Sequence, residues 1–288
     1  MLVMPALLGV SAMLAKGAPS RDTFPMSSID TSAGRIGIAV AGRDRDATPI
    51  LFLHGVGSDK SVWAPQLDHF GASRPAVAID YPGYGESASH DGASRDDFAR
   101  AAIAVLDAFG IERAHICGLS LGGVVALALN ALAPDRCASL ILADSFAVHP
   151  DGAAIFKRGA DASRAGPMRA LAEARAPALL GEAAQGDTAL VAQVIETMAG
   201  IDPTAYRQGG EAVWLADQRE RAAAVAVPTL IIVGDEDTIT PPALSRELAG
   251  MISGAQLVEI AGAGHLANLE APAAFNRAVT GFLTEIDA

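Results

Sequence analysis

The chain is 288 residues long, with 51% hydrophobic and 19% charged residues. This length and apolar content fit one large α/β domain carrying an insertion, and they exclude a largely disordered chain. The formal net charge of −12, without a run of lysine or arginine, argues against nucleic acid and anionic membranes as partners. Cys117 and Cys137 lack metal-ligand spacing, so both are expected to be small buried or half-buried hydrophobic residues.

The first residues, MLVMPALLGVSAMLAKG, form an apolar stretch that is too short to span a bilayer and is interrupted by Pro5 and Gly9. No basic residue precedes it and no clear A-x-A cleavage site follows it, so it is a weak match to an export signal. We interpret residues 1–25 as an N-terminal extension or leader, with Met26 as an alternative translation start. We expect the protein in the cytoplasm, with export through the weak signal as the alternative.

After this stretch, apolar runs alternate with amphipathic segments. Strands are predicted for the apolar runs at 35–40, 49–53, 75–80, 114–118, 138–143, 228–233 and 256–260. Apolar residues spaced three and four apart predict helices in segments such as 94–109 and 121–132. Buried strands that alternate with amphipathic helices predict an α/β fold with a mostly parallel central sheet flanked by helices.

Residues 148–218 interrupt this alternation. No convincing strand lies within them, and helical patterns punctuated by Gly or Pro occupy 152–164, 168–181 and 188–200. We predict a helical cap at 148–218, inserted between two strands of a core formed by residues 26–147 and 219–288. Because open α/β sheets bind ligands at the carboxyl ends of their strands, an insertion at that edge would cover the site.

The strongest chemical signal is AHICGLSLGG at residues 114–123, where a predicted strand runs into Gly118-Leu119-Ser120-Leu121-Gly122 and a helix follows. This is the G-x-S-x-G pattern in the strand–turn–helix context of a nucleophilic serine. The glycines permit a turn so sharp that side chains there would clash, and its strained backbone projects the Ser120 hydroxyl from the sheet edge. We therefore predict that Ser120 is the nucleophile.

A serine hydroxyl needs an adjacent base, and in this fold the acid and the histidine follow the serine in chain order. His265 comes after the predicted strand at 256–260, in the sequence Gly262-Ala263-Gly264-His265. His54 lies in the early loop, where a histidine more often supports loop structure, and the glycine-flanked strand-end setting is lacking at His69, His90, His115 and His149. We predict that His265 accepts the Ser120 proton.

The acid is predicted in the loop that follows the strand at 228–233 and precedes Pro241-Pro242. Asp237, in the middle of this loop, is expected to fix the tautomer of His265 and to stabilise its imidazolium. Asp235 in the same loop is interpreted as a turn cap. Asp144, just after the strand at 138–143, is the other candidate: it could supply the acid, support the structure or line the pocket.

Two backbone N–H groups are expected to form an oxyanion hole. One belongs to Leu121, directly after the nucleophile, and the other to Val56 in the loop His54-Gly55-Val56-Gly57. Weaker candidates for the pocket wall, each with ordinary packing or loop support as the alternative, are His54, Trp63, Met168, Trp214 and Leu266. No motif has metal-ligand or cofactor-binding spacing, so neither a metal nor a cofactor is predicted.

These segments together resemble the α/β-hydrolase superfamily over nearly the whole chain. The resemblance lies in HGVGSDKSVWAPQL, DYPGYGES, GLSLGG, GDEDTITPP and GAGHLANLEAPAAF. Within the superfamily the chain is most similar to 3-oxoadipate enol-lactonases and related esterases, through the GSDKSVWAPQ, DPTAYRQGGEAVWLAD and HLANLE blocks. This likeness implies an α/β-hydrolase fold and hydrolysis of a carboxylic ester or lactone through an acyl-enzyme, without a cofactor. A serine at the turn argues against the similar haloalkane dehalogenases, which use an aspartate there.

Two departures leave other specificities open. His54-Gly55 stands where enol-lactonases often carry Asn-Ser, and Arg158, Arg164 and Arg169 of the predicted cap form no obvious cluster for a dicarboxylate. Alternatives on the same triad are a carbon–carbon bond hydrolase and a cofactor-free perhydrolase. An alternative from another class is a ligand receptor with slow turnover. We expect a small-molecule ester or lactone as substrate and a monomer or homodimer.

Overall fold

One sheet of eight strands runs through the residues that the computed structural model describes, which are 26–42, 47–90 and 92–287. The interpretation of residues 1–25 therefore lies outside the described residues. The strands in chain order are β1 (Met26–Thr31), β2 (Gly34–Ala41), β3 (Ile50–Leu53), β4 (Ala76–Ile79), β5 (Ala114–Leu119), β6 (Cys137–Ala143), β7 (Thr229–Gly234) and β8 (Gln256–Ile260). All strands except β1 coincide with predicted runs to within two residues. β1 escaped prediction because MSSIDT offers a single large aliphatic residue besides its methionine.

The strand order is β1-β2-β4-β3-β5-β6-β7-β8, with antiparallel pairing of β1 with β2 and of β2 with β4. From β4 to β8 all neighbours are parallel, which confirms the mostly parallel sheet. Every residue of β3, β4, β5 and β7 is buried, as expected for a sheet covered on both faces. The chain reverses its direction of travel across the sheet between β3 and β5, and such a switch point opens a crevice at the carboxyl ends of the strands.

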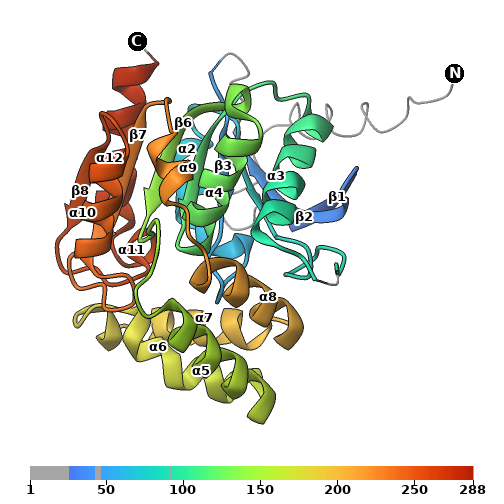
Figure 1. Ribbon diagram of the computed structural model, residues 1–288, viewed down its shortest axis with the longest axis vertical. Coiled ribbons are helices and arrows are strands. Elements are labelled where there is room, and N and C mark those ends of the chain that lie inside the picture. Colours follow the sequence, from blue (N-terminus) through green and yellow to red (C-terminus); the bar gives the residue numbers. More distant parts are fainter. Residues whose placement is uncertain (1–25, 43–46, 91, 288) are drawn as a thin grey trace, which may run out of the picture.

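Helices cover both faces of the sheet (Figure 1). One face carries α3 (Arg95–Phe109), α4 (Leu121–Leu132) and α10 (Pro242–Met251), and the other carries α2 (Ala64–Phe70) and α12 (Pro272–Ile286). The predicted helices at 94–109 and 121–132 are confirmed as α3 and α4. Ser94 begins α3 through a capping box, and Gly110 ends it with a φ of 65°.

Between β6 and β7 the described chain contains helices and no further strand of this sheet. These helices are α5 (Gly152–Ala165), α6 (Met168–Leu179), α7 (Thr188–Ala199), α8 (Pro203–Trp214) and the short α9 (Arg219–Ala223). An isolated β-bridge between Val148 and Asp217 joins the two ends of the segment that carries α5 to α8. We call residues 148–218 the helical insertion. Figure 1 shows α5 to α8 gathered at one end of the sheet, away from the helices that flank it.

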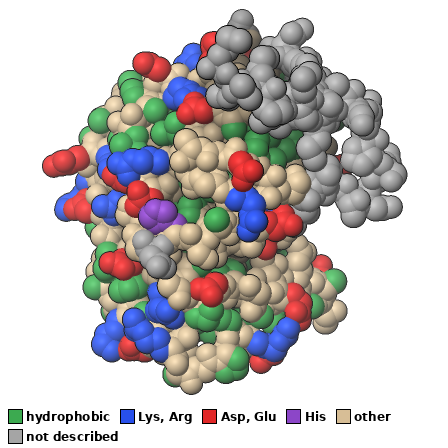
Figure 2. All heavy atoms as spheres, turned by 90° about the vertical axis from the view of Figure 1, so that its right-hand side faces the viewer, with side chains coloured by type: hydrophobic (Ala, Val, Ile, Leu, Met, Phe, Trp, Pro, Cys, Tyr) green, Lys and Arg blue, Asp and Glu red, His purple; other side chains and the backbone are tan. Residues whose placement is uncertain are grey.

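The distribution of surface charges and the burial of the two cysteines agree with what the sequence predicts. On the face drawn in Figure 2, acidic and basic side chains are interspersed without a continuous basic patch. Cys117 and Cys137 are fully buried and unbonded, as expected. No helix in the described ranges combines the length and apolar character needed to cross a membrane.

Candidate active site

Ser120 occupies the turn where β5 passes directly into α4. Its φ of 55° and ψ of −111° form a conformation that residues other than glycine rarely adopt. Two glycines make this turn possible, since a Cβ at Gly118 would overlap the carbonyl of Gly122, and a Cβ at Gly122 would overlap the carbonyl of Leu53. The Ser120 N–H donates to the Ala143 carbonyl at 2.8 Å, which ties the turn to the end of β6. The strained glycine-flanked turn expected from the sequence is therefore present.

His265 and Asp237 are hydrogen-bonded to each other at the ends of neighbouring strands. His265 Nδ1 donates to Asp237 Oδ2 at 2.8 Å, and the side chains are 6% and 0% exposed. The loop after β7 carries Asp237 and the loop after β8 carries His265, so the parallel pairing of these strands brings the two side chains to one edge of the sheet. The proton on Nδ1 leaves Nε2 of the imidazole free to act as a base.

The carboxylate of Asp237 is held on both oxygens. Oδ1 accepts from the backbone N–H groups of Ile239 at 2.7 Å and Thr240 at 2.9 Å, and the Thr240 hydroxyl lies 2.6 Å from Oδ2. Burial opposes ionisation, but the charge of His265 and the hydrogen bonds from His265 and Thr240 outweigh it and lower the pKa of Asp237 below its ordinary value. Asp237 is therefore an ionised, fixed partner for the histidine at neutral pH.

The two other candidate acids have different surroundings. Asp144 is fully buried with a φ of 47°, its Oδ1 accepts from the Gly234 N–H at 2.9 Å, and its Oδ2 has no partner among the described residues. Burial first, and then the nearby charge of Asp237, raise the pKa of Asp144 well above its ordinary value. Asp235 is exposed and accepts from the Gly262 N–H at 2.7 Å, which braces its loop against the next one.

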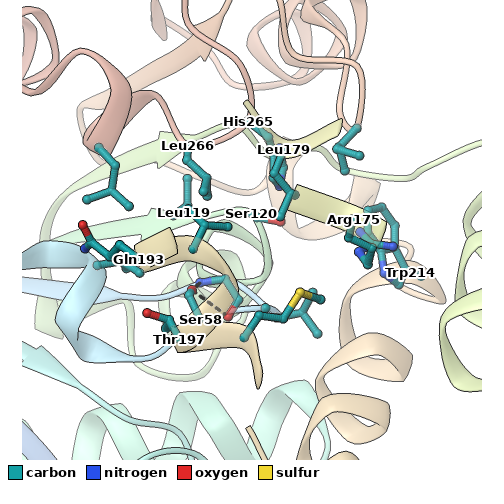
Figure 3. A pocket seen from close by; sticks show the side chains of 18 residues that line it. Ser58, Leu119, Ser120, Arg175, Leu179, Gln193, Thr197, Trp214, His265 and Leu266 are labelled. Atoms are coloured by element: carbon teal, nitrogen blue, oxygen red, sulfur yellow. Dashed lines mark hydrogen bonds between the residues drawn. The ribbon is translucent and has the colours of Figure 1, made fainter. Parts of the chain in front are cut away.

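A cleft with about 590 Å³ of empty space, part of it open to solvent, brings Ser120 and His265 to one wall. Figure 3 shows both side chains among those that surround the cleft. The Ser120 hydroxyl is buried and forms no hydrogen bond with another described residue. Half of the lining residues are aliphatic, with Val56, Val62, Leu119, Leu179, Val194 and Met198 among them.

Of the two predicted oxyanion-hole residues, Leu121 directly follows Ser120 in the chain and Val56 lines the same cleft as Ser120. Leu121 is the first residue of α4, where a backbone N–H has no acceptor inside the helix. Val56 lines the cleft, and its backbone N–H has no acceptor among the described residues. The loop after β3 reaches Ser120 closely, since a Cβ at Gly55 would stand 3.5 Å from the Cβ of Ser120.

The weaker pocket candidates divide into two groups. Trp214 and Leu266 line the cleft, whereas His54, Trp63 and Met168 do not, because they are buried elsewhere in the core. Trp63 packs on Phe52 with ring centroids 4.9 Å apart. The cleft therefore takes its aromatic wall from the helical insertion and not from the helix that follows β3.

His54 holds the peptide unit that precedes Val56. Its Nδ1 donates to the Gly55 carbonyl at 2.7 Å, and its Nε2 accepts from the Tyr81 N–H at 3.3 Å. Because the C=O and N–H of one peptide unit point in opposite directions, fixing the Gly55 carbonyl also fixes the direction of the Val56 N–H. Burial lowers the pKa of His54, so this histidine stays neutral.

Several residues of the site escaped the sequence analysis. Arg175 of α6 and Gln193 and Thr197 of α7 line the cleft. Glu270 accepts backbone N–H groups at 2.7 Å from Gly181 and at 3.0 Å from both Gly264 and Leu266, so it fastens the end of α6 to the loop of His265. Helical spacing could have placed α6, but no local pattern marks which of its arginines faces a cleft.

The remaining histidines and acids form no further site of this kind. His115 lies on β5 with its Nδ1 2.9 Å from Ser139 Oγ, and burial lowers its pKa to about 4. His69 lies 3.0 Å from Thr280 Oγ1 on the surface. Within the part of the chain that the structure describes, no group of three or more His, Cys, Asp or Glu side chains could hold a metal ion.

The chain is similar to several known hydrolases. The model of the alpha/beta hydrolase family matches residues 50–278. The chain is 29% identical over 244 residues to 3-oxoadipate enol-lactonase 1 of Acinetobacter baylyi, covering 84% of this chain and 90% of that protein. It is 31% identical over 250 residues to a pimeloyl-[acyl-carrier protein] methyl ester esterase of Neisseria meningitidis, covering 82% and 78%. The crystal structure of the enol-lactonase from Burkholderia xenovorans LB400 superposes with a TM-score of 0.84 at 29% identity, covering 90% of this chain and all of that one.

Proposed function

The chain belongs to the alpha/beta hydrolase family, and from this premise we propose that it hydrolyses a carboxylic ester or lactone through an acyl-enzyme on Ser120. One observation carries the proposal. Ser120, on a strained turn at the sheet edge, shares a cleft with His265, whose Nδ1 is hydrogen-bonded to the buried Asp237 at 2.8 Å. Serine, base and orienting acid are the parts that nucleophilic acyl transfer requires.

In the proposed first step, Ser120 Oγ attacks the substrate carbonyl carbon while its proton passes to His265 Nε2. The ionised Asp237 stabilises the imidazolium that forms, and it holds the ring in the tautomer that leaves Nε2 free. The tetrahedral intermediate then expels the alcohol oxygen, which takes the proton from His265. Water, deprotonated by the same histidine, releases the carboxylic acid and restores Ser120. The hydrogen bond between serine and histidine often tightens only in the substrate complex.

The oxyanion of that intermediate is proposed to accept hydrogen bonds from the backbone N–H groups of Val56 and Leu121. Support comes from the place of Leu121 directly after Ser120, from the place of Val56 in the wall of the same cleft, and from the lack of an acceptor for either N–H among the described residues. Each donor of this kind contributes about 10²–10³ in rate. The amino end of α4 adds a favourable dipole at the same point.

The bond type follows from the relatives. Proteins named as an enol-lactonase and a methyl ester esterase share about 30% of their residues with this chain over most of its length. Both names describe cleavage of a carbonyl–oxygen bond. We therefore place a carboxylic ester or lactone ahead of carbon–carbon hydrolysis and perhydrolysis on the same residues.

We propose that the helical insertion acts as a cap that sets substrate size. Leu179 of α6, Val194 and Met198 of α7, and Trp214 of α8 supply much of the cleft wall, so any acyl or alcohol group bound there contacts them. The core formed by residues 26–147 and 219–288 would then supply the reactive groups. This division follows the isolated bridge between Val148 and Asp217.

The test is the variant Ser120→Ala, assayed on p-nitrophenyl acetate and butyrate beside a lactone and a vinylogous diketone. We expect loss of ester and lactone hydrolysis by a factor of about 10⁴ or more, because removal of the nucleophile leaves only binding and oxyanion stabilisation. The matched control is Ser245→Ala, since Ser245 is buried on α10 and does not line the cleft. Unchanged turnover in Ser120→Ala, with an unchanged melting temperature, would disprove the mechanism.

A further inference from the structure

Arg175 brings a full positive charge to a largely apolar cleft. It projects from α6, is half-buried, and lines the same cleft as Ser120. Among the described residues that line this cleft, none is Asp, Glu or Lys. The protein as a whole is strongly acidic, with a net charge of −12. The cleft wall is therefore positively charged in a protein whose net charge is negative.

Arg175 has no protein partner that would account for this position. The described residues provide no ion pair to its guanidinium, and its Nε is buried without a hydrogen-bond acceptor. Arg169, two turns earlier on the same helix, behaves differently, because it is exposed and donates to both carboxylate oxygens of Glu196 at 2.9 and 2.6 Å. An ion pair within the protein thus explains the position of Arg169, and no such pair among the described residues explains that of Arg175.

Such a half-buried guanidinium is unfavourable, because its buried Nε N–H loses water without gaining an acceptor among the described residues. A carboxylate matches the planar fork of the guanidinium with two parallel hydrogen bonds. A dianionic phosphate would keep one of its charges uncompensated against aliphatic walls, whereas one carboxylate is neutralised by one arginine. The ligand that fits Arg175 is therefore a carboxylate.

We propose that Arg175 binds a carboxylate of the substrate, so that the ester or lactone attacked by Ser120 carries a second, free carboxylate. This inference rests on the proposed function and names its substrate class. In Figure 3, Arg175 and Trp214 lie on one side of Ser120, and Gln193 and Thr197 lie on the opposite side. The free carboxylate would occupy the side of Arg175, and an uncharged hydrogen-bonding part of the substrate would occupy the side of Gln193 and Thr197.

The kinetic test compares matched pairs of methyl esters, one monoanionic and one neutral. Monomethyl succinate, glutarate and adipate are assayed against methyl butyrate, valerate and hexanoate, with wild type, Arg175→Gln, Arg175→Lys and the control Arg169→Gln. We expect Arg175→Gln to lower kcat/KM by about 10- to 100-fold for the best monoanionic ester, since a hydrogen bond to a charged group contributes on that scale. Neutral esters should change by less than about threefold, and Arg175→Lys should recover part of the loss.

A binding test separates this inference from the proposed function. Isothermal titration of Ser120→Ala, and of Ser120→Ala combined with Arg175→Gln, with succinate, glutarate and adipate measures recognition of the carboxylate without any turnover. Binding that disappears with Arg175→Gln supports the inference even if wild type hydrolyses no ester. Equal losses on charged and neutral esters, or dicarboxylate binding that is absent or indifferent to Arg175→Gln, would overturn it and leave the role of Ser120 untouched.

Discussion

The two walls of the cleft are built in different ways. On the side of the sheet, hydrogen bonds fix the buried carboxylate of Asp237, which accepts from Ile239, Thr240 and His265. On the side of the helical insertion, the aliphatic side chains of α6 and α7 share the wall with polar and aromatic ones, and the full set is Arg175, Leu179, Gln193, Val194, Thr197, Met198 and Trp214. Hydrogen-bonded groups hold one geometry, whereas an aliphatic wall can be repacked with changes in volume alone.

From this difference we expect the sheet side to govern reactivity and the helical insertion to govern substrate selectivity. A change on the sheet side should affect all substrates alike, and a change in the insertion should affect one class of substrate. The two walls are nevertheless joined, because the His265 N–H donates to the Leu179 carbonyl at 3.0 Å and Glu270 binds N–H groups of both segments. The end of α6 is thus a fixed part of the histidine loop, and freedom to vary lies in α7, α8 and the outer turns of α6.

The largest effect expected on the sheet side, beyond that of Ser120, is for Asp237→Asn. The amide would keep the shape of the side chain but favour the wrong tautomer of His265, and in a well-studied serine protease this change lowers kcat by about 10⁴. We expect kcat to fall by about 10³–10⁴ for charged and neutral esters alike, measured as full progress curves on both classes. A loss confined to monoanionic esters would contradict the separation of the two walls.

A smaller effect is expected when the peptide unit before Val56 is released. His54→Ala removes the donor to the Gly55 carbonyl, so the Val56 N–H loses its fixed direction. We expect kcat to fall by about 10- to 100-fold with little change in KM, because an oxyanion donor acts mainly in the transition state.

His54→Asn is the matched variant, since its amide N–H can occupy the place of Nδ1. It should recover a substantial part of the rate, whereas a purely structural role would leave both variants equally impaired. Because burial keeps His54 neutral, neither variant should shift the pH profile of kcat/KM. A displaced pH profile would show that His54 acts as a titrating group.

The same division of the molecule explains what the sequence could predict. Strands β3 to β8 and the G-x-S-x-G turn are marked by continuous apolar runs and by glycines at fixed offsets, so both the sheet and the setting of Ser120 could be read locally. The loops of Asp237 and His265 follow from parallel strands, whose carboxyl ends share one edge. β1 was missed because a short antiparallel edge strand needs little hydrophobic patterning.

The wall from the insertion could not be predicted in the same way. Arg158, Arg164, Arg169 and Arg175 are alike in the sequence, and only the packing of α6 against α7 and the sheet decides that Arg175 lines the cleft. Trp63 and Trp214 were equal candidates for the same reason. A side chain is assigned to a wall by tertiary contacts that helical periodicity does not contain.

The smallest expected effect concerns Asp144, which follows the strand next to that of Asp237. Its pKa is shifted in the opposite direction to that of Asp237. Its native pKa is raised, chiefly by burial, so the folded protein keeps a proton that the unfolded chain releases above its ordinary pKa of about 3.9. The free energy of unfolding should therefore fall as the pH rises from about 4 toward neutrality. Asp144→Asn removes this dependence, because an amide does not ionise in either state. Its activity should stay within a few-fold of wild type, because Asp144 does not line the cleft.

Asp237→Asn supplies the control of opposite sign. Its native carboxyl has a lowered pKa, so its contribution to stability is present above the unfolded value of about 3.9 and is lost as the pH falls toward the native pKa. Urea denaturation at several pH values from about 2.5 to about 7.5 should show Asp144→Asn gaining stability relative to wild type as the pH rises above about 4. Asp237→Asn should lose stability relative to wild type only in the acidic part of this range, as the pH rises toward the unfolded value of about 3.9, and should keep a constant difference above it. If the free energy of unfolding of the two variants changes with pH in the same way, Asp144 is ionised beside Asp237. Both carboxylates, and not Asp237 alone, would then be candidates for the acid that orients His265.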